Sequence, residues 1–528
     1  MLDRAAPTTL VRFSLASARR LALFVPALLV AAALHAQPTD PAGPHADFRR
    51  AYRAYAERQY ERAAEHFERF RTRYDARPET ADALFYEAQS VLAQGRGSRA
   101  AVLFEDFTRR YPDHPFAAVA RLGVGRYFFE REDFAAARAS FERVGHDPSV
   151  SDEAASVALL WAAEAALRLN DDEGALALYQ RSYTTLPEAP YAPLAGYAEA
   201  FHLIRLNRQP EAARALEALE ARYPNSGFTA DLGLALTEVY HALGAYDRLV
   251  AATVPRLEGL SDEARERATY LLGDAYAHLG RSAEAERAFR TILTRYAAGA
   301  YYRPALYGVG HAELALSRPR DAARSFALAR EDSADTLARR AAYAEGIAHV
   351  QGARPDSALT AFARTYEAWP GTAEATHALF EAAMLQYGRT RYAEAAALFE
   401  RFAEAAPRGD TRTGEALELA ANALVATGDV SAAERLFERA ASQSGSAEAR
   451  DALSFQRATF LYGAGSFQQA YDRFRTLAEN GRPAEIRPDA LFWAAESAFS
   501  ARRYGDTVTL SARYLERHAQ GRFADAAR

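Results

Sequence analysis

The sequence predicts an all-α fold, a right-handed superhelical solenoid of about thirteen helix-turn-helix repeats of about 37 residues. A small residue, then an alanine twelve residues later, then a phenylalanine four residues after that, recur every 36 to 38 residues. The four residues between the alanine and the phenylalanine correspond to about one turn of an α-helix, and the small side chains allow two helices to approach closely. A period of this size is typical of solenoids, in which each hairpin can bury its apolar face only against its neighbours.

We call these slots the small, alanine and phenylalanine positions. The alanine position is occupied by Ala63, Ala100, Ala137, Ala175, Ala212, Leu249, Ala285, Ala322, Ala358, Ala395, Ala433, Ala470 and Thr507. The small position holds Ala51, Ala88, Gly125, Ala163, Ala200, Thr237, Gly273, Gly310, Gly346, Ala383, Ala421, Ala458 and Ala495. The phenylalanine position holds Phe67, Phe104, Phe141, Phe289, Phe326, Phe362, Phe399, Phe437 and Phe474, with Tyr179 and Leu216 as substitutes.

Residues 1–36 have the pattern of a signal peptide. A basic leader ending at Arg20 precedes an apolar stretch of 14 residues, Leu21 to Leu34, and Ala36 is the small residue that a signal peptidase prefers. Cleavage is expected after Ala36, because a membrane span needs about 20 apolar residues; a retained anchor is the alternative. Residues 37–44 form a Pro-rich linker.

Residues 45–246 are predicted to form repeats 1–6. The small and alanine positions are expected to touch where two antiparallel helices meet, and the phenylalanine seals the pair. We expect this in the repeat core of Gly125, Ala137 and Phe141, and again in the later repeats at Gly273, Ala285 and Phe289 and at Gly310, Ala322 and Phe326. The aromatic stripe is interpreted as packing rather than a ligand site.

Residues 247–262 form a degenerate segment. Leu249 and Thr253 replace the alanine and the phenylalanine, and Pro255 stands where the second helix should continue. Proline within a helix removes a donor and clashes with the preceding turn, so we expect the helix to break here and the array to kink. A degenerate repeat in a continuous spiral is the alternative.

Residues 263–528 are predicted to form repeats 7–13. The last repeat degenerates to Thr507 and Ser511, and Phe523 to Arg528 is similar to the beginning of another first helix. Because a solenoid needs a cap over its last apolar face, we expect the array either to continue in another protein or to belong to a longer chain.

The pattern resembles the tetratricopeptide repeat. Leu272, Gly273, Tyr276, Gly280, Ala285 and Phe289 occupy the positions of that motif, and five closing prolines, at Pro112, Pro187, Pro224, Pro370 and Pro407, each lie twelve residues after the alanine position. Runs such as Phe104 to Pro112 are similar to a bacterial envelope subgroup, which includes the lipoprotein BamD and the Tol-associated periplasmic coordinator of wall synthesis. The chain has no cysteine, so it cannot carry the lipid of BamD.

Composition narrows the classes of function. A net charge of -5 and a pI near 6.2 give no basic field for nucleic acid. Motifs of metalloproteases, P-loops, serine hydrolases and calcium loops do not occur, and the histidines lack ligand spacing. We therefore predict no enzyme activity, no cofactor, no metal and no membrane span after cleavage of the signal.

The resemblance implies a concave groove, lined by the first helices, that receives peptides or partner helices. Two slots of the first helix, eleven and seven residues before the alanine position, should face this groove. In repeats three to five these slots hold the charged residues Arg126, Glu130, Glu164, Arg168 and Arg205. This charged strip could clamp a carboxylate group, although a salt-bridged solvated face is the alternative. A second series, fifteen residues before the alanine position, is expected to be half-buried between neighbouring first helices; it comprises Phe48, Phe85, Tyr197, Tyr270, Tyr307, Tyr343, Phe380, Phe455 and Phe492.

The sequence thus predicts an exported, periplasmic or envelope-associated scaffold that binds other proteins, with outer-membrane or cell-wall assembly factors as candidate partners. Two alternatives stay open. One is a self-assembling array that associates through its uncapped C-terminal end, and the other is a recruiting module of a longer chain with a further functional domain.

Overall fold

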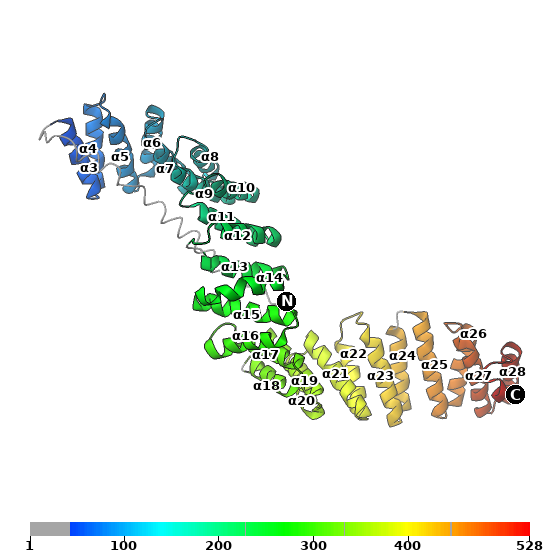
Figure 1. Ribbon diagram of the computed structural model, residues 1–528. Helices are drawn as coiled ribbons and strands as arrows, with labels where there is room; N and C mark the ends of the chain where they lie inside the picture. The colour runs from blue at the N-terminus through cyan, green and yellow to red at the C-terminus, as the bar shows by residue number, and fades with distance from the viewer. Residues whose placement is uncertain (1–42, 227–228, 332, 444–445) are drawn as a thin grey trace. The chain divides into compact units, whose positions relative to one another are not determined.

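The computed structural model describes residues 43–226, 229–331, 333–443 and 446–528 (Figure 1). The predicted signal peptide and residues 37–42 of the linker lie outside the described residues. The chain divides into two compact units, residues 1–268 and 269–528, which we call unit 1 and unit 2. All regular secondary structure in the described ranges is helical.

Unit 1 consists of helices that follow one another along the chain. They are α3 Pro44–Ala56, α4 Tyr60–Arg73, α5 Glu79–Ala93, α6 Gly97–Arg110, α7 Ala117–Glu130, α8 Phe134–Gly145, α9 Asp152–Arg168, α10 Asp172–Thr185, α11 Ala192–Arg205, α12 Gln209–Arg222, α13 Thr229–Ala242, α14 Tyr246–Thr253 and the 3-10 helix η1 Val254–Gly259. Helix α15, Asp262–His278, spans the division between the units.

Unit 2 continues the same alternation. Its helices are α16 Ser282–Arg295, α17 Tyr302–Ala315, α18 Pro319–Arg330, α19 Thr336–Gln351, α20 Pro355–Ala368, α21 Ala373–Gly388, α22 Tyr392–Ala405, α23 Arg412–Thr427, α24 Val430–Gln443, α25 Ala447–Gly463, α26 Phe467–Asn480, α27 Ile486–Ser500, α28 Tyr504–Arg517 and α29 Ala524–Ala527.

The helices form hairpins, each with a first and a second helix, and within each unit neighbouring helices pack side by side (Figure 1). The alanine position is the fourth residue of every second helix, from Ala63 in α4 to Thr507 in α28. The predicted all-α solenoid of helical hairpins is confirmed.

Each hairpin turn places one residue in the left-handed region of backbone space, five residues before the alanine position. Glycine occupies this place in five turns, as at Gly280 with φ 72°, but Arg58, Ala353 and Thr390 adopt φ of 60°, 52° and 58°. The left-handed conformation costs a residue with a Cβ atom about 1–2 kcal/mol. The turn geometry therefore overrides local preference at the non-glycine positions.

The small position packs directly against the phenylalanine position of the same hairpin. A methyl group added at Gly125 would lie 2.6 Å from the ring of Phe141, and one added at Gly310 would lie 2.6 Å from the ring of Phe326. The atoms nearest to an added methyl group thus belong to the ring, and the contact between the small and alanine positions stays a prediction. We call this contact the interlock.

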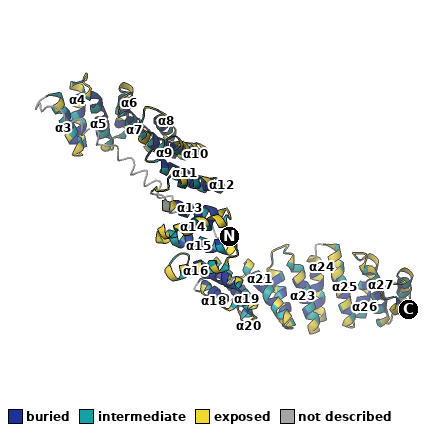
Figure 2. Cartoon of the chain, viewed as in Figure 1, coloured by how far each residue is buried: buried dark blue, intermediate teal, exposed yellow. Residues whose placement is uncertain are grey.

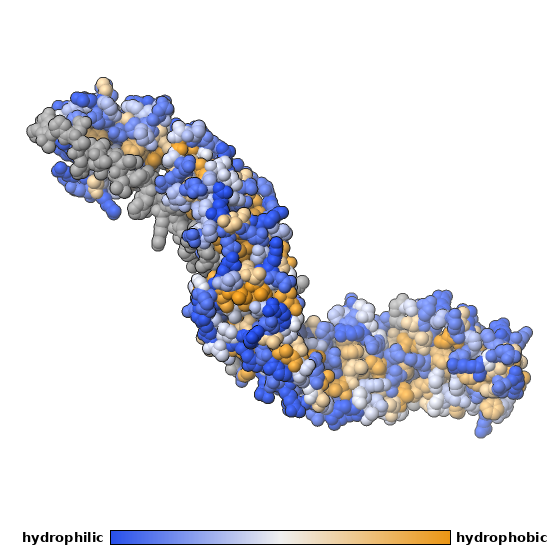
Figure 3. Space-filling model, in the orientation of Figure 1, coloured by the Kyte–Doolittle hydropathy of each residue, from blue (hydrophilic) through white to orange (hydrophobic). Residues whose placement is uncertain are grey.

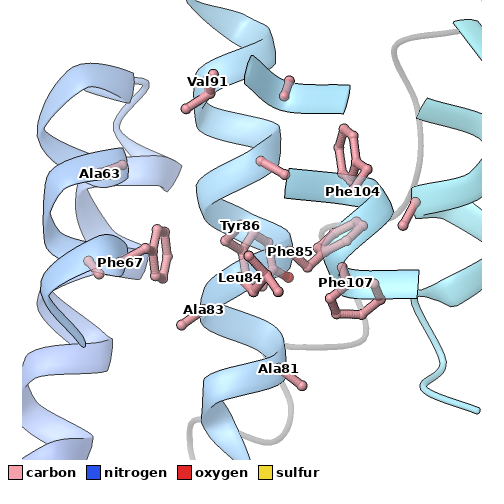
Figure 4. Packing of buried hydrophobic residues seen from close by; sticks show 14 of the residues in the cluster. Ala63, Phe67, Ala81, Ala83, Leu84, Phe85, Tyr86, Val91, Phe104 and Phe107 are labelled. Carbon is pink, nitrogen blue, oxygen red and sulfur yellow. The ribbon is translucent and has the colours of Figure 1, made fainter. Parts of the chain in front are cut away.

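The same ring also reaches the next hairpin. Phe289 of α16 lies against Gly273 of its own first helix and against Gly308 of the following first helix, where added methyl groups would lie 2.7 Å and 2.6 Å from the ring. One ring therefore fixes the spacing of three helices. Aromatic residues in buried clusters do the same at the start of unit 1, where Phe67 stacks on Tyr86 at 5.7 Å (Figure 4). Buried residues accordingly line the inside of each stack of helices (Figure 2).

The sixth hairpin replaces the interlock by a polar pair. Thr237 and Thr253 occupy the small and phenylalanine positions, both are buried, and their hydroxyl oxygens lie 2.7 Å apart. Helix α14 ends at Thr253, two residues before Pro255, and η1 follows. The α-helix thus stops where the proline was expected to break it, while the kink of the array stays a prediction.

Buried carboxylates link successive hairpins. Arg71 of α4 donates to Glu87 of α5 at 2.9 Å, and Arg290 of α16 donates to Glu313 of α17 at 2.7 Å. Burial raises the pKa of both carboxyl groups, and the arginines oppose that rise. Removal of one partner would leave a buried charge without compensation, so each pair holds its two hairpins in register.

We predict that Gly310→Val destabilises the protein, because the added side chain would collide with the Phe326 ring. Overpacking of a close contact costs about 1–3 kcal/mol, and a lowered thermal midpoint by circular dichroism would show it. Gly414→Val is the control, since an added methyl group there meets nothing within 4 Å. Equal effects of the two substitutions would contradict the interlock.

Thr390→Gly should raise the thermal midpoint. Glycine relieves the left-handed strain of a β-branched residue, and we expect a gain of about 1 kcal/mol after the entropy cost of glycine. The reverse change at an equivalent turn, Gly280→Thr, should lower the midpoint at least as much. A Thr390→Gly protein that is less stable than the parent would show that the turn is not strained.

Asp335 provides a pH-dependent cap. Its carboxylate accepts hydrogen bonds from the Ala338 amide at 2.8 Å and from Arg303 at 2.7 and 3.2 Å. The hydrogen bond from Arg303 contributes most to lowering the pKa of Asp335. Because the folded pKa lies below the unfolded value of about 3.9, the stabilisation is present at neutral pH and is lost as pH falls below about 4.

Accordingly, Asp335→Ala should cost about 1–2 kcal/mol at pH 7, and the difference from the parent should vanish towards pH 2 in thermal unfolding. Asp335→Asn keeps a capping oxygen and should show a smaller loss with no such pH dependence. A loss by Asp335→Ala that persists unchanged in acid would refute this role.

Candidate partner-binding surface

The predicted charged strip lies on three first helices of unit 1. Arg126 and Glu130 belong to α7, Glu164 and Arg168 to α9, and Arg205 to α11. All five side chains are partly exposed, with Glu164 the least so. The sequence period therefore places them on successive first helices at equivalent turns.

Within the strip, charges pair inside each helix and not between helices. Arg126 donates to Glu130 at 2.7 Å and Arg168 to Glu164 at 3.3 Å, both across one helical turn. Such pairs on an exposed helix stabilise it by about 0.3–0.5 kcal/mol. Each carboxylate of the strip thus already has an arginine partner on its own helix.

Two of the arginines have further neighbours. The guanidinium of Arg168 lies 5.9 Å from the ring centroids of Phe129 and Phe134, and Arg205 lies 3.1 Å from Nδ1 of His202 and 3.7 Å from Asp172. These contacts are those of a salt-bridged, solvated face. A carboxylate ligand would have to compete with them, so binding by this strip stays a prediction.

The aromatic series fifteen residues before the alanine position lies between neighbouring first helices. Phe48, Phe85 and Phe492 are buried, and Tyr307, Tyr343 and Phe380 are half-buried. Most members therefore combine a packed ring with a solvent-facing edge.

In unit 2, three members of this series form a row along consecutive first helices. Tyr270 lies on α15, Tyr307 on α17 and Tyr343 on α19; we call them the tyrosine row. Among the described residues, their three hydroxyl groups form no hydrogen bond. These phenols can therefore donate to an acceptor on a partner.

Charged groups of later first helices gather around this row. The phenol of Tyr307 is in the electrostatic range of Arg340 on α19 and Glu374 on α21, and that of Tyr343 is in the range of Glu381 on α21 and Arg412 on α23. Charges on the next two first helices therefore act on each of these phenols. Glu374 pairs with Arg339 at 2.7 Å.

Burial disfavours charge at the row. It raises the pKa of Tyr307, and that of Tyr343 to about 12, so both are neutral phenols at physiological pH. His311 packs edge-on against Tyr307 with ring centroids 4.5 Å apart. Solvent reaches one side of the imidazole, but the protein atoms around it lower its pKa and favour the neutral form.

Unit 2 also exposes apolar side chains. Met384 is exposed on α21, and the visible face of unit 2 carries apolar patches among hydrophilic ones (Figure 3). Sequence reasoning placed the tyrosines between helices but missed the groups that gather around them, because these come from helices one and two repeats further along the chain. The tyrosine row thus offers hydrogen-bond donors with charged groups nearby, and tyrosine is among the residues enriched at protein interfaces.

Further observations limit the chemistry of this surface. No three His, Asp or Glu side chains come together as a metal site would require within the described ranges. The helices of residues 43–528, leaving aside the undescribed positions, include none that is long and apolar enough to cross a membrane.

Two family models match three parts of the chain. A tetratricopeptide repeat-like domain matches residues 48–185, and a tetratricopeptide repeat matches residues 241–300 and 343–410. The chain is a tetratricopeptide repeat protein. Such repeats generally mediate protein–protein interactions, and proteins built from them are typically non-catalytic scaffolds. No curated protein matches the chain.

Solved structures are similar to this tetratricopeptide repeat protein at low identity. The structure of Naa15/Naa10 bound to HypK-THB has 14% identity and a TM-score of 0.36, and it covers 92% of this chain and 78% of the other. The Cut9–Hcn1 hetero-tetramer of the APC/C has 14% identity and a TM-score of 0.25, and the match covers 92% of this chain and 96% of the other. A tetratricopeptide repeat protein from Parabacteroides merdae has 16% identity and a TM-score of 0.28, and the match covers 51% of this chain and 98% of the other. The family assignment rests on the family models.

Proposed function

We propose that this protein is a non-catalytic scaffold of the bacterial cell envelope that holds segments of partner proteins against its first helices, with the tyrosine row as a principal contact. The observation that carries the proposal is a set of neutral phenols on three consecutive first helices, whose hydroxyl groups form no hydrogen bond within the part of the chain that the structure describes. A bound segment can accept hydrogen bonds from the hydroxyl groups of Tyr307 and Tyr343.

The leader sequence supports a location in the cell envelope. The basic residues up to Arg20, the apolar stretch from Leu21 to Leu34 and the small Ala36 are the parts of an export signal. The absence of cysteine removes lipid anchoring through a thiol, so the mature scaffold would act in the periplasm or bound to envelope proteins. Outer-membrane and wall-assembly factors are the partners that the resemblance to envelope repeats favours.

The partner surface can be tested by removing hydroxyl groups without disturbing the rings. Tyr307→Phe combined with Tyr343→Phe should leave the thermal midpoint unchanged and weaken capture of the bound partner from an envelope extract. Each lost hydrogen bond is worth about 1 kcal/mol, or about fivefold in affinity. Quantitative mass spectrometry of chemically crosslinked complexes would measure the change.

Further variants distinguish the tyrosine row from the charged strip. Arg324→Ala removes an exposed charge on the second helix α18 and should leave capture unchanged, whereas Arg126→Ala with Arg168→Ala and Arg205→Ala tests the charged strip. Undiminished capture by the double phenylalanine variant would reject the tyrosine row. Loss of capture only in the triple alanine variant would move the site to the strip.

A further inference from the structure

The charges around the tyrosine row change sign from one member to the next. Burial has the largest effect on the pKa of both phenols, and charged side chains come after it. At Tyr307 the stronger of the two charges is an arginine, Arg340 of α19, whereas at Tyr343 it is a carboxylate, Glu381 of α21. The surface is therefore mainly positive near Tyr307 and mainly negative near Tyr343, whose rings belong to the consecutive first helices α17 and α19.

The packing of α21 on α19 brings Glu381 to this row. The imidazole of His377 on α21 lies against the Tyr343 ring, with the ring centroids 6.0 Å apart. Glu381 stands four residues after His377, and residues at this spacing are neighbours on the surface of a helix. Glu381 therefore lies one helical turn along α21 from the residue that contacts Tyr343.

Glu381 has no counter-ion of its own. Its side chain is half-buried, and among the described residues its carboxylate forms no hydrogen bond and no ion pair. The cation in its electrostatic range, Arg412, is already bound by Asp410 at 3.3 and 3.0 Å. Because Arg412 and Asp410 neutralise each other, Glu381 leaves one negative charge uncompensated.

Arg340 leaves a positive charge in the same way. Its guanidinium lies 3.7 Å from the carboxylate of Glu374, but that carboxylate also pairs with Arg339 at 2.7 Å. Two arginines thus share one carboxylate. The Arg340 side chain is 36% exposed, so its guanidinium is accessible to an acidic group of a partner.

These two charges do little for the fold. A partly desolvated charge without a close counter-ion costs free energy instead of supplying it. The carboxylates Glu87 and Glu313, which link hairpins, each have an arginine within 2.9 Å, and Glu381 has none. The uncompensated pair is therefore better explained by a partner than by the stability of the stack.

Met384 adds an apolar contact beside Glu381. It stands three residues after Glu381 on α21, which makes the two residues neighbours on the helix surface, and it is 41% exposed. The charged head of a lysine or arginine bound to Glu381 can thus lie beside an apolar side chain that receives its aliphatic stem. A basic side chain of a partner therefore fits this place better than a small polar one.

We propose that the tyrosine row binds a segment of another protein that carries both an acidic and a basic side chain, the acid against Arg340 beside Tyr307 and the base against Glu381 beside Tyr343. This inference rests on the function proposed above, since it assigns the partner's chemistry at the same site. The opposite charges also set the direction in which the segment lies, because a reversed segment would meet a like charge at each end.

Peptides selected on the full chain test this pattern. A randomised peptide-display library should be enriched in members with an acidic and a basic residue at a fixed separation. Selection on Glu381→Gln should lose the preference for the basic residue and keep that for the acidic one, and selection on Arg340→Gln should do the converse. Sequencing of the enriched pools measures both preferences.

An enriched peptide, labelled with fluorescein and titrated with the full chain, measures the affinity by anisotropy. Glu381→Gln should weaken binding about fivefold, and replacing the peptide's basic residue by glutamine should add no further loss in that variant. Glu404→Gln is the control, because it removes an exposed carboxylate from the second helix α22 and should leave the affinity unchanged.

The outcomes separate this inference from the proposed function. Enriched peptides that need the hydroxyl groups of Tyr307 and Tyr343 but lack the charge pattern, or that ignore Glu381→Gln, would overturn the inference alone. An absence of peptides that depend on these hydroxyl groups would overturn both. A lowered thermal midpoint of Glu381→Gln would assign the carboxylate to the fold, and a dimer in sedimentation velocity that this variant abolishes would identify the occupant as a second copy; either result would overturn the inference.

Discussion

Close approach between a phenylalanine ring and a side chain of one carbon or none is the constraint on which the rest of the structure depends. The Phe289 ring fills the space that a Cβ atom would take at Gly273 and at Gly308, so it sets the distance from one second helix to two first helices at once. Neither helix of a hairpin buries enough apolar surface alone. Repetition of this contact converts marginal hairpins into a stack whose members stabilise one another.

Much of the fold could be predicted, because the interlock requires particular side-chain sizes at fixed spacings. The alanine position begins the second turn of every second helix, as the period indicated. The turns were less predictable: Arg58, Ala353 and Thr390 adopt a left-handed conformation that their side chains disfavour, and only the geometry of the hairpin imposes it. The Thr237–Thr253 pair was also unforeseen, since two hydroxyl groups replace an aromatic contact without loss of register.

The candidate surface was less predictable for a related reason. The charged strip was found from its position in the repeat, but a linear pattern does not reveal that Arg126 and Arg168 already have partners one turn away. The groups around the tyrosine row come from helices up to two repeats distant, as Arg412 does for Tyr343. Sequence spacing locates a face, whereas the packing of successive helices decides which groups meet on it.

Residue-resolved hydrogen–deuterium exchange on the intact protein tests the interlock most directly. The account predicts the slowest exchange in the first helix around each small position that faces a phenylalanine ring, as at Gly310, and faster exchange around Thr237, where the ring is absent. Protection that follows helix length alone, with α13 as slow as α17, would contradict it.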